Sequence, residues 1–146
     1  MPAFLFLYTV KTPYMKRVLT ILFAAMLLAA CNGPSKEEAR RHLAQEAKAG
    51  NEEMKKQDFT QATVCTGITF DNDNLYYNYT IDERYTNMSV FRNNREKLKK
   101  DIETAVATAA GIKGIIKSLK VLDGKMIYTY RGSISNDTVC IIVDME

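Results

Sequence analysis

The sequence predicts an α+β domain in which a four-stranded antiparallel sheet carries helices packed on one face. Two long segments repeat apolar residues at helical spacing, and shorter segments alternate apolar and polar residues. The second half of the chain also repeats the strand pattern of the first half. Together these observations predict a single domain over residues 35–146 with the element order α-β-β-α-β-β.

The first helix is predicted from about Ser35 to Lys56. Ser35 and Glu38 fit a capping box, in which the serine accepts from a first-turn amide and the glutamate reaches back to the serine N–H. Four apolar residues then recur at helical spacing: Ala39, Leu43, Ala47 and Met54. This stripe indicates that the helix packs against the rest of the domain.

A β-hairpin follows the first helix. Apolar side chains alternate with polar ones from Val64 to Phe70 and again from Leu75 to Ile81, on either side of a polar turn at residues 71–74. Tyr77 and Tyr79 share the apolar phase of the second strand, so we expect them in the core.

A second long helix is predicted over about Ser89–Ala110, ending at Gly111. The stretch from Gly114 to Leu122 fits a short helix, although Asp123-Gly124 is also a strong hairpin turn, and we favour the helix.

Two strands complete the domain. Residues 126–130 repeat the pattern of residues 75–79, which places Tyr128 and Tyr130 in the core, and residues 139–143 form the last strand.

The N-terminal region has the parts of an export signal. Met15 is followed by Lys16 and Arg17, an apolar run over residues 18–28, and the small residues Ala29 and Ala30. This run is shorter than the roughly 20 residues that a spanning helix needs. Residues 15–30 are therefore predicted to be a signal peptide, and residues 1–14 to result from an early assigned start codon.

Leu28-Ala29-Ala30-Cys31 resembles the lipobox of bacterial lipoproteins. The resemblance implies that the Cys31 thiol is diacylated, that the signal is cut before it, and that the new amino terminus is acylated. Three chains would anchor the protein permanently, because each buried CH₂ contributes about 0.8 kcal/mol. Asn32, rather than an aspartate, follows the cysteine, which by the sorting rule of the family favours the outer membrane. A cleaved secretory signal with a chance cysteine is the alternative.

Residues 31–34 would then be the lipidated cysteine and a short tether that spans only about 10 to 14 Å, which keeps the domain near the membrane. The overall charge gives no support for a nucleic-acid partner. Three of the 20 basic residues, Lys11, Lys16 and Arg17, precede Cys31, where there is no acidic residue, so the remainder balances the 17 acidic residues.

The other two cysteines, Cys65 and Cys140, form an even pair in an oxidising compartment. Each is out of phase with the best core positions of its strand, so both could lie on the uncovered face of the sheet. If the first and last strands are neighbours, a disulfide between them is possible. Two separate thiols are the alternative.

No catalytic or cofactor motif is found, and we expect neither an enzyme nor a cofactor. His42 lies four residues from both Glu38 and Glu46, on one helix face. One imidazole with two carboxylates does not select any particular metal, and surface ion pairing explains the spacing of His42, Glu38 and Glu46 better. No metal site is therefore predicted.

Two surfaces are candidate contact sites. One is a basic run in the second helix: Arg92, Arg95, Lys97, Lys99 and Lys100. It suits anionic head groups or an acidic partner, although a solvated helix face also explains it. The other is the open sheet face, with aromatic, aliphatic and arginine side chains that suit protein contact: Tyr76, Ile127, Arg131 and Ile142.

These features favour a membrane-anchored envelope lipoprotein that is not an enzyme and that holds or escorts an envelope protein. The lipobox and the element order loosely resemble the pilotin-like lipoproteins that escort secretion channels, without a shared motif. The alternative is a lipoprotein that binds a small apolar ligand between helices and sheet, where Ala105, Ala109 and Gly111 would leave room.

Overall fold

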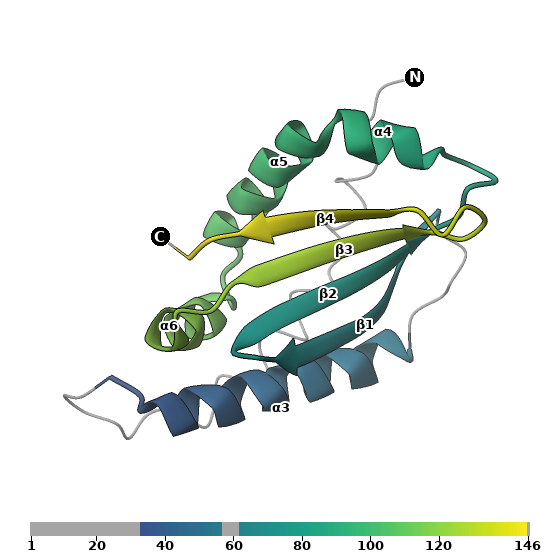
Figure 1. Ribbon diagram of the computed structural model, residues 1–146. Helices are drawn as coiled ribbons and strands as arrows, with labels where there is room; N and C mark the ends of the chain where they lie inside the picture. Colours follow the sequence, from purple (N-terminus) through teal and green to yellow (C-terminus); the bar gives the residue numbers. More distant parts are fainter. Residues whose placement is uncertain (1–32, 57–61, 146) are drawn as a thin grey trace.

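The computed structural model describes residues 33–56 and 62–145 (Figure 1). The predicted signal peptide and Cys31 lie outside the described residues. The described elements, in chain order, are α3 (Lys36–Met54), β1 (Thr63–Asp71), β2 (Asn74–Ile81), α4 (Met88–Asn93), α5 (Arg95–Thr108), α6 (Lys113–Leu122), β3 (Met126–Gly132) and β4 (Thr138–Val143). The α+β class and its four strands are confirmed.

The four strands form one sheet in the order β1-β2-β3-β4. The two outer pairs are antiparallel, as predicted, but the central pair β2–β3 is parallel. The prediction of an all-antiparallel sheet is therefore wrong at its centre. The helices between β2 and β3 carry the chain back to the end where β2 begins, and such a crossover makes the next strand parallel (Figure 1).

The internal repeat of the sequence becomes a strand pair. Leu75 lies beside Met126, Tyr77 beside Tyr128, and the register continues without a shift to Ile81 beside Gly132. The two similar segments therefore place their apolar residues on the same face of the sheet.

Helix α3 begins as predicted. The Ser35 Oγ accepts from the Glu38 N–H at 3.2 Å, and the Glu38 carboxylate accepts from the Ser35 N–H at 2.7 Å. Its buried residues are those of the predicted stripe: Ala39, Leu43, Ala47 and Met54. The helix ends at Met54, two residues earlier than expected.

The helices lie on one face of the sheet, as predicted. α3 packs on β1, α4 and α5 pack on β4, and α6 packs beside α3. Tyr128 and Tyr130 are buried, and Tyr77 and Tyr79 pack against the same core. The prediction that these four tyrosines belong to the core is confirmed.

The predicted second helix is divided at Asn94. The Asn94 side chain donates to the Val90 carbonyl at 2.8 Å and its backbone leaves the helical region, so α4 ends and α5 begins there. An asparagine side chain that bonds to the backbone competes with helical hydrogen bonds. α5 ends at Thr108, before the predicted Ala110, and α6 is a helix, as favoured above.

A side chain from α3 covers part of the outer edge of β1. The Asn51 amide donates to the Ile68 carbonyl at 2.7 Å and accepts from the Ile68 N–H at 2.8 Å. Asn51 thus takes the place of a neighbouring strand at that point and protects an edge that would otherwise offer free backbone groups.

Candidate functional site

The sheet face opposite the helices is built from rows of side chains that cross the strands. The row nearest the β1–β2 turn holds Thr69, Tyr76, Ile127 and Ile142. The next row holds Gly67, Asn78, Thr129 and Cys140, and the third holds Val64, Thr80, Arg131 and Thr138.

The structure therefore brings together three of the four residues that the sequence proposed for this face. Tyr76, Ile127 and Ile142 are direct neighbours on β2, β3 and β4. Ile142 is 39% exposed, and Tyr76 and Ile127 are half-buried. Arg131 is exposed two rows away, where its guanidinium donates to the Asn136 side chain at 2.8 Å.

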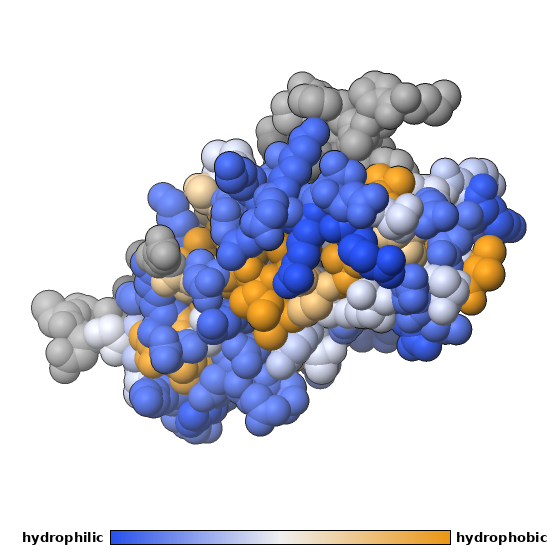
Figure 2. Space-filling view, turned by 45° about the horizontal axis from the view of Figure 1, so that its top comes forward, coloured by the Kyte–Doolittle hydropathy of each residue, from blue (hydrophilic) through white to orange (hydrophobic). Residues whose placement is uncertain are grey.

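The basic run lies on two helices and is partly neutralised. Arg92, on α4, pairs with Asp137 at 2.8 Å, and Lys99, on α5, lies 3.8 Å from Glu103. Arg95 and Lys100 are exposed. Figure 2, which brings the α4–α5 side forward, shows a mostly hydrophilic surface with a central band of hydrophobic residues. The run is thus a charged helix face with acidic neighbours.

Cys65 and Cys140 lie far apart, on opposite edges and opposite faces of the sheet. Three strand spacings separate β1 from β4, about 14 Å, whereas a disulfide needs Cα atoms within about 7 Å. Cys140 is on the open face beside Thr129, but a bulge after Cys65 turns this side chain toward Tyr79 on the core face. A disulfide is expected only if the first and last strands are neighbours. β1 and β4 are not neighbours, and Cys65 and Cys140 are both free.

We expect the intact mass of the mature protein to be the same before and after reduction, because neither thiol can reach the other. Burial raises the pKa of the Cys65 thiol. Since the thiolate is the reactive form, iodoacetamide should label Cys65 much more slowly in the folded protein than in urea. A mass gain of two hydrogen atoms on reduction of the monomer would contradict this placement.

His42 links α3 to α6. Its Nδ1 lies 2.8 Å from the Ser118 Oγ, and its Nε2 lies 3.1 Å from the Glu46 carboxylate. Glu38 turns away to cap the helix, and the described residues contain no group of three His, Cys, Asp or Glu side chains suited to a metal. Serine, histidine and glutamate are also the groups of a hydrolytic relay. Ser118 is only 4% exposed between two helices, so we assign this contact to packing.

Two exposed apolar residues, Tyr85 and Ile134, lie at the end of the sheet opposite the β1–β2 turn, and the sequence did not indicate them. The Glu83 carboxylate accepts from the Ser135 and Ile134 N–H groups, both at 2.7 Å, and these bonds lower the pKa of Glu83. They join the β2–α4 loop to the β3–β4 turn. Nearby stand Tyr85, 72% exposed, and Ile134, 68% exposed. Single apolar residues in polar loops have no periodicity, so no sequence signal could have identified them.

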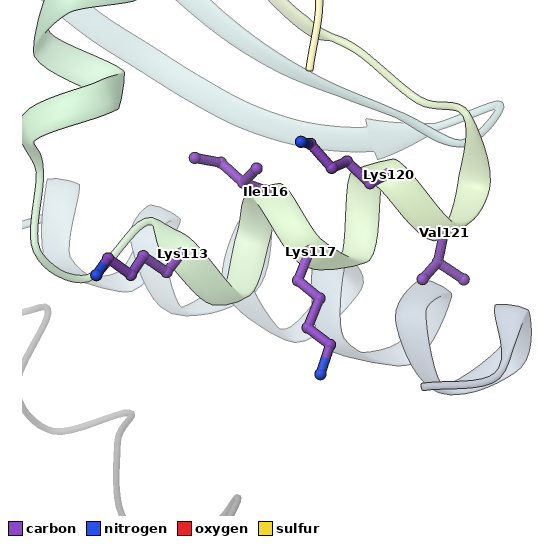
Figure 3. A pocket seen from close by; sticks show the side chains of 5 residues that line it. All are labelled: Lys113, Ile116, Lys117, Lys120 and Val121. Atoms are coloured by element: carbon purple, nitrogen blue, oxygen red, sulfur yellow. The ribbon is translucent and has the colours of Figure 1, made fainter. Parts of the chain in front are cut away.

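A shallow hollow runs along the outer side of α6. The residues that line it are Lys113, Ile116, Lys117, Lys120 and Val121. Figure 3 shows Ile116 and Lys120 on the edge nearer the strands and Lys117 and Val121 on the opposite edge. The apolar spacing of residues 114–122 predicts the helix but does not single out its lysines as a surface.

The ligand alternative finds no support in the residues proposed for it. Ala105 lies on the exposed side of α5, so its small side chain opens no space between helices and sheet. Ala109 and Gly111 are half-buried in the connection to α6.

Comparison with known proteins identifies no family. No family model matches the chain, and no curated protein matches it. A crystal structure of a Pseudomonas aeruginosa protein, described as "a putative secreted protein", has a similar fold. Its TM-score is 0.54 at 11% identity, and the match covers 73% of this chain and 92% of that one. Within the described residues, no helix is both long enough and apolar enough to span a membrane.

Proposed function

We propose that this chain is a lipid-anchored lipoprotein of the cell envelope that presents the open face of its sheet to an envelope protein. The observation that carries the proposal is the row formed by Tyr76, Ile127 and Ile142 across β2, β3 and β4. Aromatic and aliphatic side chains at the centre of a patch are typical of protein interfaces. The role that we propose is binding or escort of that protein.

The anchor would be Cys31, in the outer membrane. The lipobox-like sequence before Cys31 supports the anchor. The likeness in fold to a protein described as "a putative secreted protein" fits export and does not bear on the anchor itself. With only residues 32–34 between Cys31 and the N-cap Ser35, the membrane would lie beside the first turn of α3.

Lipidation is tested by expressing the full precursor in a bacterium and labelling it with a radioactive fatty acid. We expect label in the wild-type protein and none in Cys31→Ala, which should also accumulate as the uncut precursor. The matched control is Cys140→Ala, which removes a cysteine from the open face and should be labelled and cut like wild type. Equal labelling of Cys31→Ala and wild type would remove the anchor from the proposal.

Partner binding is tested with photo-crosslinking side chains at Tyr76 and Ile142 in the native membrane, and with one at the exposed Thr104 of α5 as the control. We expect both sheet positions to capture the same envelope protein and Thr104 not to capture it. Ile127→Glu, which puts a charge in the centre of the row, should abolish capture while the circular dichroism spectrum stays native. If Ile127→Glu leaves capture unchanged, the row is not the binding surface.

A further inference from the structure

We propose that the outer side of α6 is a docking surface for anionic lipid head groups of the membrane in which the protein is anchored. This inference rests on the proposed lipid anchor, because the anchor brings that end of the domain to the bilayer. It assigns the membrane-facing surface of the domain to a helix that is separate from the open sheet face.

On the part of the chain that the structure describes, the outer side of α6 carries unpaired positive charge. Lys113, Lys117 and Lys120 are spaced i, i+4 and i+7, so they form one stripe along α6. The helix contains no acidic residue, and none of these lysines forms an ion pair within the described residues. By contrast, Arg92 and Lys99 of the basic run have acidic neighbours. Among the described residues, the α6 stripe is therefore a cationic surface with charge available for an anionic partner.

α6 lies at the end of the domain where the anchor would be attached. α6 packs along α3, where Ser118 bonds to His42, and the residue after its C-cap, Gly124, lies against Asp73 in the β1–β2 turn. Arg40, in the second turn of α3, pairs with the same Asp73 at 2.8 Å. α6 therefore lies beside the start of α3, where the anchor would be attached (Figure 1). The far end of α3 is about 28 Å away along its axis.

The shape of the surface suits head groups. The half-buried Ile116 and Val121 flank the lysine stripe, and together these residues line the shallow hollow of Figure 3. Lysine ammonium groups over apolar stems fit the boundary between water and the acyl region. Each lysine near an anionic surface raises membrane affinity roughly fivefold, so three raise it on the order of a hundredfold.

The chain contains no tryptophan, so a single introduced one reports on its own position. The probe protein is the mature lipoprotein purified from membranes, with Val121→Trp or, as a second reporter, Ile116→Trp. Vesicles contain a nitroxide-labelled lipid in either phosphatidylcholine alone or a mixture with phosphatidylglycerol. Ile134→Trp reports on the opposite end of the domain.

We expect the nitroxide lipid to quench the tryptophan fluorescence of the α6 reporters strongly in the anionic vesicles and much less in the neutral vesicles. The fluorescence of Ile134→Trp should be unaffected in both. The triple change Lys113→Gln, Lys117→Gln and Lys120→Gln should remove the difference. The matched triple change Arg95→Gln, Lys99→Gln and Lys100→Gln on α5 should leave it intact. Equal quenching of the α6 reporters in vesicles with and without phosphatidylglycerol would overturn the inference. So would a difference that the α5 triple change removes and the α6 triple change does not.

Flotation with vesicles tests the anchor independently of the α6 lysines. If the wild-type protein does not float with neutral vesicles, the proposed anchor is wrong. Flotation with anionic vesicles then tests whether α6 binds anionic lipid. Flotation that weakens on the order of a hundredfold in the α6 triple then still supports the lipid surface. Flotation that is absent, or equal in the two triples, rejects it.

Discussion

Gly124→Ala is expected to destabilise the domain by about 3 kcal/mol, at the upper end of the cost of overpacking. A Cβ at this position would overlap the Asp73 carbonyl oxygen and lie 3.0 Å from Leu119 Cδ2. The oxygen is a backbone atom and Leu119 is fully buried, so neither can move aside cheaply. The substitution therefore forces apart the C-terminal end of α6 and the β1–β2 turn.

The turn cannot move away without losing other bonds. The Asn74 side chain accepts from the Lys125 N–H at 2.9 Å, and the Leu75 N–H donates to the Lys125 carbonyl at 2.9 Å. These bonds hold the start of β2 to the start of β3. A displacement that relieves the clash breaks them and leaves backbone groups without partners.

Urea unfolding followed by circular dichroism measures the effect, with Gly33→Ala as the control. A Cβ at Gly33 has nothing within 4 Å, so its substitution should change the free energy of unfolding by less than about 1 kcal/mol in either direction. Equal midpoints for Gly124→Ala and Gly33→Ala would show that the α6–β3 junction is not closely packed against the turn.

The parts of this fold that follow from local pattern were predictable. The buried stripe of α3 and its capping box depend on residues within a few turns of one another, and the structure contains both. The parallel pairing of β2 with β3 was not predictable, because a strand alternates in the same way beside either kind of neighbour. The path of the chain through α4, α5 and α6 decides the direction of β3 relative to β2. The residues of the two strands give no signal of that direction.

The candidate sites also contain features that follow from local sequence pattern and features that depend on distant contacts. Tyr76, Ile127 and Ile142 were placed on one face from alternation alone, and the register makes them neighbours. Cys65 was placed on the wrong face, because the bulge between Cys65 and Gly67 shifts the alternation by one residue. The lysines of α6 form a candidate surface because α6 packs beside α3, and this contact between distant segments has no local pattern in the sequence.

Tyr128→Ala is expected to cost about 4 kcal/mol, within the range for removing a buried aromatic ring. The Tyr128 ring stacks on Tyr77 with centroids 4.9 Å apart and lies 6.4 Å from Tyr79, which stacks in turn on Tyr130. Phe91 of α4 continues the stack at 5.3 Å from Tyr130. Loss of the Tyr128 ring therefore leaves a cavity between β2 and β3 and removes its aromatic contacts with both Tyr77 and Tyr79.

The matched control is Tyr128→Phe, which keeps the ring. The hydroxyl contacts Met126 Sδ at 3.9 Å, a weak hydrogen bond, so its loss should cost less than about 1 kcal/mol. A large loss of stability in Tyr128→Phe would mean that the hydroxyl, and not the stacked ring, holds this part of the core.

Tyr128→Phe also tests the protonation of the stacked tyrosines at high pH. Burial raises the pKa values of Tyr77, Tyr128 and Tyr130 above the ordinary value of about 10. Above pH 10 the unfolded chain loses these protons while the folded chain keeps them, so the free energy of unfolding falls as the pH rises and is unaffected below that range. Each such tyrosine contributes up to about 1.4 kcal/mol per pH unit. Urea midpoints measured from pH 8 to pH 11 should therefore fall less steeply in Tyr128→Phe than in wild type, and parallel curves would show that Tyr128 ionises equally in both states.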